Sequence, residues 1–265
     1  MYSFSYQRAA SVDDASAILA ARPRAKLLAG GQTLVAAMKL RLADPGDIVD
    51  LGAVKGLSEI RVEGRTVTIG AMTRHAEVAA SAEVRTAIPA LAALAGGIAD
   101  RMVRNMGTIG GSVANNDPSA DYPAAVLALG AKVVTQRRTI AADAFFTGMF
   151  ETALEAGEII TAVNFPAPVR AAYMKFRNPA SRYAIVGVFV ADLGGSVRVA
   201  VTGAGPVVFR MTAMEQALTA RFAPDAIAGI KAPEEGLNVD IHAGADHRAH
   251  LITVMAMRAV AAALG

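Results

Sequence analysis

Residues 104–130, RNMGTIGGSVANNDPSADYPAAVLALG, carry more structural signals than any other stretch of this sequence. A Gly-Gly pair stands in Thr108-Ile109-Gly110-Gly111-Ser112, where we expect a strand-like run to end. Further along, Asp117 and Pro118 predict the N-cap and first position of a helix, and Gly130 is placed to end it. The stretch therefore predicts a glycine-rich loop followed by a capped helix.

A second Gly-Gly loop, Ala29-Gly30-Gly31-Gln32-Thr33, lies nearer the N-terminus, between the strand-like residues 26–29 and a helical pattern that begins at Leu34. Glycines let a ligand approach the backbone, and the free N–H groups at the start of a helix attract anions. The loop at 108–112 adds further N–H donors and two hydroxyls. Two such loops, if they converge, suit a diphosphate, although a Gly-Gly pair by itself is more often an ordinary turn.

Other nucleotide-binding patterns are missing. No Gly-x-Gly-x-x-Gly follows a predicted strand, and no Gly-x-x-x-x-Gly-Lys-[Ser/Thr] is present. Both a Rossmann dinucleotide site and a P-loop are therefore disfavoured.

The periodicity of apolar residues divides the chain into parts with different architectures. An α-β-α-β rhythm over the first 55 residues is typical of a small parallel sheet, with Ser11 as N-cap of its first helix. A hairpin pattern follows over 60–69, and Pro166 and Pro168 mark a domain boundary. The remaining expected elements are helical segments at 75–95, 211–220 and 246–264, a strand at 159–165, and an antiparallel pair at 183–191 and 197–201.

Composition limits the chemistry. The 265 residues include 26 Lys+Arg against 23 Asp+Glu, a formal net charge of only +3, so nucleic acid is not the expected partner. The chain has no cysteine, which excludes disulfides, thiolate catalysis and Cys-ligated iron–sulfur clusters on this polypeptide. Any redox chemistry must use a bound organic cofactor or the metal of a partner.

Neither a membrane span nor an export signal is predicted, because residues 1–10 are polar and the charge-free stretches are shorter than the ~20 residues that a span needs. We expect a cytoplasmic protein that does not associate with membranes.

Two long stretches resemble a known family. AGGQTLVAAMKLRLADPGDIVDL (29–51) and VRNMGTIGGSVANNDPSADYPAAVLAL (103–129) are similar to the signature sequences of the FAD-binding medium subunit of molybdenum hydroxylases, the xanthine dehydrogenase and carbon monoxide dehydrogenase family. The similarity continues through EIITAVNFP (158–166), YMKFR (173–177) and the C-terminal GAGPV, MEQAL and AHLITVMAMRAV segments. It therefore covers nearly the whole chain.

The resemblance implies an α+β, two-subdomain FAD-binding fold of the vanillyl-alcohol-oxidase/PCMH type. In this fold a small parallel sheet and an antiparallel sheet with helices form the FAD-binding domain, here 1–166 with subdomains of about 1–55 and 56–166. A C-terminal domain of antiparallel sheet and helices, 169–265, follows.

The same resemblance implies an FAD site, with the diphosphate on the two Gly-Gly loops and Gln32 a mild departure from the family pattern. Asp121 would accept hydrogen bonds from FAD hydroxyls, Ile98 and Ile160 would pack near the flavin, and Lys175 would lie near the isoalloxazine. From the residues alone, Asp121 is equally a first-turn helix acid, Lys175 a solvated strand residue, and the two isoleucines core residues. The expected cofactor-binding residues are Leu28, Ala29, Gly30, Gly31, Gln32, Thr33, Leu34, Ile98, Thr108, Ile109, Gly110, Gly111, Ser112, Asp121, Ile160 and Lys175.

A further departure is Arg182-Tyr183, where the family often has an acid before the Ala-Ile-Val strand. It bears on the shielding of the flavin edge and on the choice of electron acceptor. Tyr183 could stack near the ring or simply pack.

The histidines show no ligand pattern. His247 and His250 are one helical turn apart, yet we interpret them as surface helix positions, and nothing around His75 supports a covalent flavin link. No metal site and no catalytic side chain are predicted in this chain.

By resemblance, a partner's molybdenum cofactor would oxidise the substrate, [2Fe–2S] clusters of another partner would relay electrons, and FAD here would pass them to NAD, oxygen or a quinone. The partners would be a large molybdenum-binding and a small iron–sulfur subunit, in a dimer of heterotrimers. Two alternatives are a stand-alone flavin-dependent oxidase and an FAD-free assembly protein.

Overall fold

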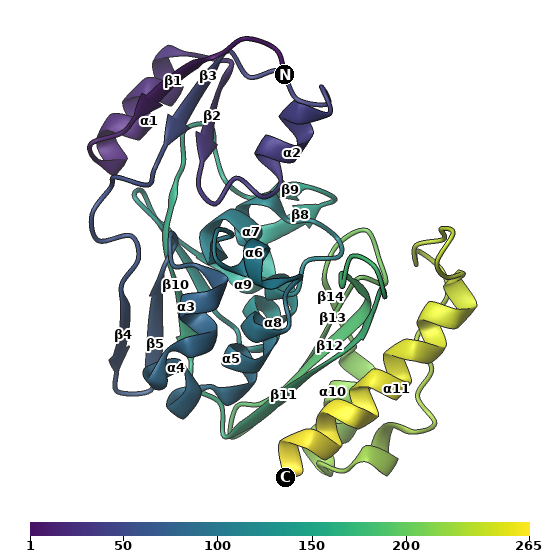
Figure 1. Cartoon of the computed structure of the whole chain (residues 1–265). Coiled ribbons are helices and arrows are strands. Elements are labelled where there is room, and N and C mark those ends of the chain that lie inside the picture. The colour runs from purple at the N-terminus through teal and green to yellow at the C-terminus, as the bar shows by residue number, and fades with distance from the viewer.

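The computed structural model describes residues 1–265 and begins with a small parallel sheet (Figure 1). Its strands are β1 (Ser5–Arg8), β2 (Ala25–Leu28) and β3 (Asp47–Asp50), in the order β1-β3-β2, accompanied by α1 (Val12–Ala21) and α2 (Leu34–Lys39). Ser11 caps α1 as predicted, because its side chain accepts from the Asp14 N–H at 3.0 Å. Strand β1 was not expected from the sequence, since its SYQR residues are nearly all exposed and show no apolar alternation.

A five-stranded antiparallel sheet forms the second part. Its order is β4-β5-β10-β6-β7. Strand β10, the last of these in the sequence, therefore lies between the predicted β4–β5 hairpin and a second hairpin formed by β6 and β7. The bounds are β4 (Ile60–Glu63), β5 (Thr66–Gly70), β6 (Lys132–Thr135), β7 (Thr139–Ala141) and β10 (Ile160–Pro166), with a small hairpin of β8 (Phe146–Gly148) and β9 (Glu151–Thr152) after α9 (Ala142–Phe145).

Short helices pack against this sheet. The helical segment predicted at 75–95 is three helices, because Ser81 caps a new helix and Pro89 starts another. The helices of this layer are α3 (His75–Ala80), α4 (Ala82–Ala87), α5 (Pro89–Gly96), α6 (Arg101–Arg104), α7 (Ile109–Asn115) and α8 (Tyr122–Ala128).

Two local predictions in the 104–130 stretch are wrong. The helix does not begin at Pro118: Asp117 instead accepts the Ser119 N–H in a turn, and α8 begins at Tyr122 with Pro123 in its first turn. The loop at 108–112 does not follow a strand either, because α6 precedes it and Thr108 is the N-cap of α7. Gly130, with φ of 62°, does end α8 as expected.

The C-terminal part is a four-stranded antiparallel sheet in the order β11-β12-β13-β14, with helices on its outer face (Figure 1). Its bounds are β11 (Arg170–Arg177), β12 (Ala184–Asp192), β13 (Val197–Thr202), β14 (Phe209–Arg210), α10 (Thr212–Ala220), the 3₁₀ turn η1 (Pro224–Ile227) and α11 (Ala245–Leu264). Both sheet faces are buried: Phe189 joins the core of the five-stranded sheet, whereas Val188 packs against α10 and α11.

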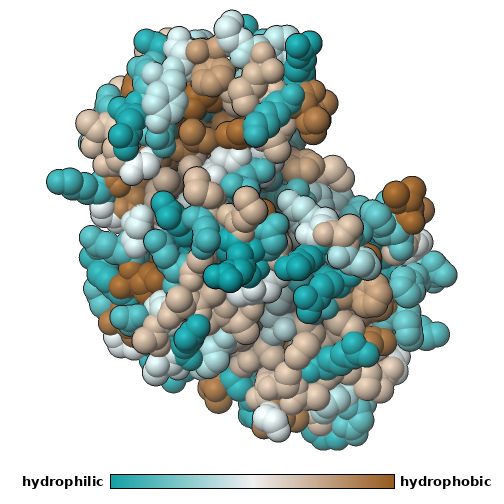
Figure 2. Space-filling view, viewed as in Figure 1, coloured by the Kyte–Doolittle hydropathy of each residue, from teal (hydrophilic) through white to brown (hydrophobic).

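Together the parts form an α+β architecture, as predicted. Strand β10 ends at Pro166 and β11 begins at Arg170, and the division into two domains there stays a prediction. None of the helices combines the length and apolar character that a membrane crossing requires. On the face shown in Figure 2, polar and apolar residues are interspersed.

Candidate functional site

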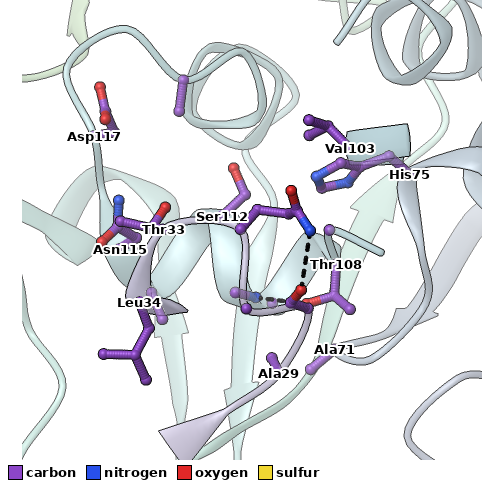
Figure 3. A pocket seen from close by; sticks show the side chains of 18 of the residues that line it. Ala29, Thr33, Leu34, Ala71, His75, Val103, Thr108, Ser112, Asn115 and Asp117 are labelled. Carbon is purple, nitrogen blue, oxygen red and sulfur yellow. Dashed lines mark hydrogen bonds between the residues drawn. The ribbon is translucent and has the colours of Figure 1, made fainter. Parts of the chain in front are cut away.

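A cavity of about 550 Å³ lies between the small parallel sheet and the helices of the second part. In Figure 3, Ala29, Thr33 and Leu34 come from the first glycine loop, and Thr108 and Ser112 from the second. His75 and Val103 lie toward one end of the view and Asp117 toward the other. The cavity is within the range of 300–1,000 Å³ typical of small-molecule and cofactor sites.

The first loop offers unpartnered backbone donors to this cavity. None of the backbone N–H groups of residues 30–34 donates a hydrogen bond to another residue of the chain, and residues 30–34 all line the cavity. Gly31 has a φ of 71°, a conformation that glycine adopts without strain, and so turns the chain into α2. Consecutive free amides of this kind form a concave site for anionic oxygens.

The two loops come together because Gly30 has no side chain. A Cβ atom on Gly30 would lie 2.2 Å from the Met106 carbonyl oxygen and 2.6 Å from the Gly107 Cα atom. Both are backbone atoms and cannot turn aside as a flexible side chain would. The convergence that the diphosphate hypothesis required is therefore present, and this glycine makes it sterically feasible.

The second loop differs from the prediction, because its amides are already engaged. Ile109 and Gly110 donate to the carbonyls of Thr73 and Ala71, and Gly111 donates to Thr108 Oγ1. The Ser112 N–H donates to the Thr108 carbonyl. This loop thus supplies a close backbone surface and hydroxyls, while the first loop supplies the run of free N–H donors.

Asp121 lies in the cavity wall and is tied to the C-terminal sheet. Its Oδ1 atom is 2.9 Å from Lys175 Nζ and also accepts the Tyr173 hydroxyl. Burial raises the pKa of Asp121, while Lys175 and the Tyr173 hydroxyl act in the opposite direction. Lys175 itself does not line the cavity, because its ammonium group is engaged by Asp121 and the Gly97 carbonyl.

The other predicted residues fall into two groups. Ile98 and Ile160 line the cavity and supply apolar surface. Leu28 and Ile109 do not line it: Leu28 packs against Gly31, and Ile109 is the fully buried side chain of the second loop. Of the expected set, the cavity is lined by Ala29, Gly30, Gly31, Gln32, Thr33, Leu34, Ile98, Thr108, Gly110, Gly111, Ser112, Asp121 and Ile160.

His75 is a lining residue that the sequence did not reveal as such. Its ring lies 5.3 Å from the Tyr122 ring and packs so close to Gly107 that a Cβ there would be 2.6 Å from Nε2. Burial, and then the charge of Arg104, lower the pKa of His75 to about 4, so the imidazole is neutral at pH 7. Its Nδ1 atom is buried without a hydrogen-bond partner.

Glu158 and Tyr183 also line the cavity. Arg138 donates to both carboxylate oxygens of Glu158 at 2.9 Å and, with Thr135, holds the pKa of Glu158 at about 2. Tyr183 is 49% exposed at the rim. Tyr183 was singled out from the sequence, at the Arg182-Tyr183 departure, whereas no pattern pointed to Glu158, because its partners Thr135 and Arg138 lie about twenty residues earlier.

His247 and His250 are exposed on α11, and the structure contains no group of three His, Cys, Asp or Glu side chains that could hold a metal ion. The interpretation of these histidines as surface positions is confirmed.

Comparison with known proteins agrees with this geometry. Residues 2–168 match the family described as "FAD binding domain in molybdopterin dehydrogenase". The chain belongs to this family. The nicotine 6-hydroxylase medium subunit of Paenarthrobacter nicotinovorans is 36% identical over 269 residues, covering 96% of this chain and 95% of that protein. The carbon monoxide dehydrogenase medium chain of Hydrogenophaga pseudoflava is 36% identical over 281 residues, 98% of this chain and 96% of that one.

Solved structures of the family extend the match to the C-terminal sheet. Carbon monoxide dehydrogenase from Hydrogenophaga pseudoflava superposes with a TM-score of 0.89 at 36% identity, covering 99% of this chain and 98% of that chain. Quinoline 2-oxidoreductase from Pseudomonas putida 86 gives 0.88 at 29% identity, covering 99% and 97%. This chain therefore shares the fold of these oxidoreductase subunits over nearly its whole length.

The residues present fit an FAD. The free amides of residues 30–34 match the oxygens of a diphosphate, and a Cβ on Gly30 would collide with the facing loop. Ile98 and Ile160 provide apolar surface for an aromatic ring system, and Asp121 provides a carboxylate acceptor.

Proposed function

We propose that this chain is the FAD-binding electron-transfer subunit of a molybdenum-containing hydroxylase or dehydrogenase. The observation that supports it best is the pair of glycine loops facing one cavity, with the free amides of residues 30–34 on one side. In this proposal electrons arrive from the [2Fe–2S] clusters of a partner and leave to NAD, oxygen or a quinone.

The residues of this chain bind and orient the cofactor. The amides of residues 30–34 hold the diphosphate, Thr108 and Ser112 contribute hydroxyls, Ile98 and Ile160 contact the ring system, and Asp121 accepts from a cofactor donor. When bound, FAD supplies the ability to accept and release electrons, which no side chain here provides.

The proposed partners are a large molybdenum-binding subunit and a small iron–sulfur subunit, arranged as a dimer of heterotrimers. Relatives are named medium subunits or medium chains, which implies larger and smaller companions. The absence of cysteine supports placing the clusters on another polypeptide. A cytoplasmic location stays a prediction.

The central test is to purify the protein and identify its cofactor and companion chains. We expect a flavin absorption spectrum, FAD on release by acid, and co-purifying chains that contain molybdenum and iron.

Gly111→Val should abolish FAD binding, because a Cβ there already lies 2.9 Å from Thr108 Oγ1 and 3.5 Å from Ala29 Cβ. Gly195→Val is the control, since no atom lies within 4 Å of a Cβ at Gly195.

The two alternatives predict different results. A stand-alone oxidase turns over an organic substrate without companion chains, whereas an electron-transfer subunit does not. An assembly protein lacks FAD and is unaffected by Gly111→Val. Wild-type protein without bound or bindable FAD would contradict our proposal.

A further inference from the structure

The turn that leads to Asp121 is held by the C-terminal sheet. The Thr202 hydroxyl, at the end of β13, donates to the Ala120 carbonyl, 2.6 Å from Oγ1, and the Pro118 carbonyl oxygen lies 3.1 Å from the same Oγ1 atom. The Gly203 N–H also donates to the Pro118 carbonyl, at 2.8 Å. The backbone that carries Asp121 into the cavity wall is thus fixed from outside the FAD-binding part.

The Asp121 side chain is fixed from the same sheet. Tyr173 and Lys175 are two residues apart on β11, so their side chains point to the same face of the sheet. Both donate hydrogen bonds to this carboxylate. Lys175 Nζ lies 2.9 Å from Oδ1 and 3.1 Å from Oδ2, and the Tyr173 hydroxyl donates to Oδ1. Since a carboxylate has about four acceptor positions, one remains on Oδ2, and Asp121 is a lining residue of the cavity.

The sheet is shaped around the Tyr173 hydroxyl. On the neighbouring strand β12, a Cβ at Gly187 would lie only 2.2 Å from the Tyr173 hydroxyl oxygen. The Tyr173 ring also stacks on Phe189, with centroids 6.1 Å apart. The phenol is therefore held between a glycine and an aromatic ring, with its hydroxyl on Asp121.

Tyr173 and Lys175 make different contributions to the carboxylate. An ammonium on a four-carbon stem supplies charge without a fixed direction, and Lys175 shares its donors with the Gly97 carbonyl. A packed phenol supplies one donor from a fixed position. Lys175 therefore supplies charge to both carboxylate oxygens, and Tyr173 adds a hydrogen bond that fixes the direction of Oδ1.

We propose that Tyr173 is a positioning residue for the cofactor: through its hydrogen bond it holds Asp121 so that the open acceptor position on Oδ2 receives an N–H or O–H donor of FAD. The inference rests on the proposed function, because it requires FAD in the cavity. It makes the C-terminal sheet part of the cofactor site although Tyr173 does not line the cavity.

The test is a double-mutant cycle on the full chain, with FAD titrated into apoprotein and followed by flavin fluorescence. Tyr173→Phe removes only the hydroxyl, and we expect the FAD dissociation constant to rise roughly tenfold, as for a lost hydrogen bond to a charged group. In an Asp121→Ala background the same change should alter the constant less than about twofold, because no side-chain acceptor is left at position 121 for Tyr173 to orient. A purely structural role of Tyr173 would weaken FAD equally in both backgrounds.

Tyr6→Phe is a matched control, since Tyr6 also donates its hydroxyl to an aspartate, Asp50, but away from the cavity lining. It should leave the dissociation constant unchanged. Equal affinity of wild type and Tyr173→Phe, or equal factors in the two backgrounds, would overturn the inference alone. Failure of the wild-type protein to bind FAD would instead remove the proposed function.

Discussion

Gly30 decides how closely the two glycine loops approach. Its Cα atom faces the Met106–Gly107 peptide, and a methyl group there would overlap the Met106 carbonyl oxygen. The overlap involves backbone on both sides, so the loops must separate to relieve it.

We expect Gly30→Ala to weaken FAD binding at least tenfold and to cost about 1–3 kcal/mol of unfolding free energy, as overpacking does. Equilibrium titration with FAD and urea denaturation measure the two effects. Gly229→Ala is the control, because a Cβ at Gly229 meets nothing within 4 Å. Unchanged FAD affinity of Gly30→Ala would show that the approach of the loops does not matter.

At the scale of single residues, the role of the glycines could be predicted from the sequence, but the hydrogen-bond partners of the loop amides could not. Both Gly-Gly pairs could be identified because few residues tolerate such close backbone contact. The second loop was wrongly expected to have free amides, because its acceptors, the Thr73 and Ala71 carbonyls, come from a segment more than thirty residues earlier. The burial of His75 was hidden for the same reason.

Glu158 joins the segment between β9 and β10 to the turn between β6 and β7. It follows β9 and accepts hydrogen bonds from Arg138 and Thr135, at the turn between β6 and β7, as well as from the Glu155 N–H. Its side chain is fully buried, whereas the Arg138 side chain is 43% exposed.

This carboxylate makes stability depend on pH. The pKa of Glu158 is about 2 in the folded protein against an ordinary value of 4.5, so the unfolded chain binds more protons between these values. The stabilisation is therefore complete above pH 4.5 and is lost as the pH falls toward 2. Its upper bound is about 3 kcal/mol, from 1.36 kcal/mol for each pKa unit.

Glu158→Gln should lower the melting temperature at pH 7 and flatten its decline between pH 4.5 and 2, measured by calorimetry over a pH series. Glu59→Gln, at an exposed glutamate, is the control and should reproduce the wild-type curve. Parallel curves for wild type and Glu158→Gln would contradict the assignment.

Among the elements, those with a local signal were predicted and those made by pairing were not. Helix α1 has its cap and acids within its own sequence, and the β4–β5 hairpin has its own turn. Strand β1 exists because it pairs with β3, about forty residues later, and β10 enters the second sheet between two hairpins. The start of α8 was misplaced because Asp117 and Pro118 favour a turn as readily as a helix.

Over the whole molecule, the C-terminal sheet is shared between two cores. Phe189 on β12 is fully buried on the side of the FAD-binding part, and its neighbours Val188 and Val190 are buried on the side of α10 and α11. A sheet buried on both faces links the packing of the two parts.

Phe189→Ala should therefore destabilise the entire chain by about 3–5 kcal/mol, the usual cost of such a truncation. Urea unfolding followed by flavin fluorescence and by far-ultraviolet circular dichroism should give coincident transitions for both the wild-type and the variant holoprotein. Phe176→Ala, at a phenylalanine that is 40% exposed, serves as control and should cost much less. Separate transitions would show that the two parts unfold independently.

The sequence alone did not show that the C-terminal sheet is packed between two cores. The run AIVGVFVAD at 184–192 predicts a buried strand, but a continuous apolar run does not say what covers each face. The α+β class was implied by the resemblance, whereas the two-sided packing of this sheet required coordinates.

The first glycine loop presents its donors as main-chain amides at residues 30–34. Every amino acid except proline carries the same N–H group, so neutral drift at Gln32, Thr33 and Leu34 leaves the number of these donors intact. The glycines have no such tolerance, because they are needed for shape. As sequences diverge, we therefore expect the backbone conformation of such a site to be kept while the residues at the non-glycine positions change.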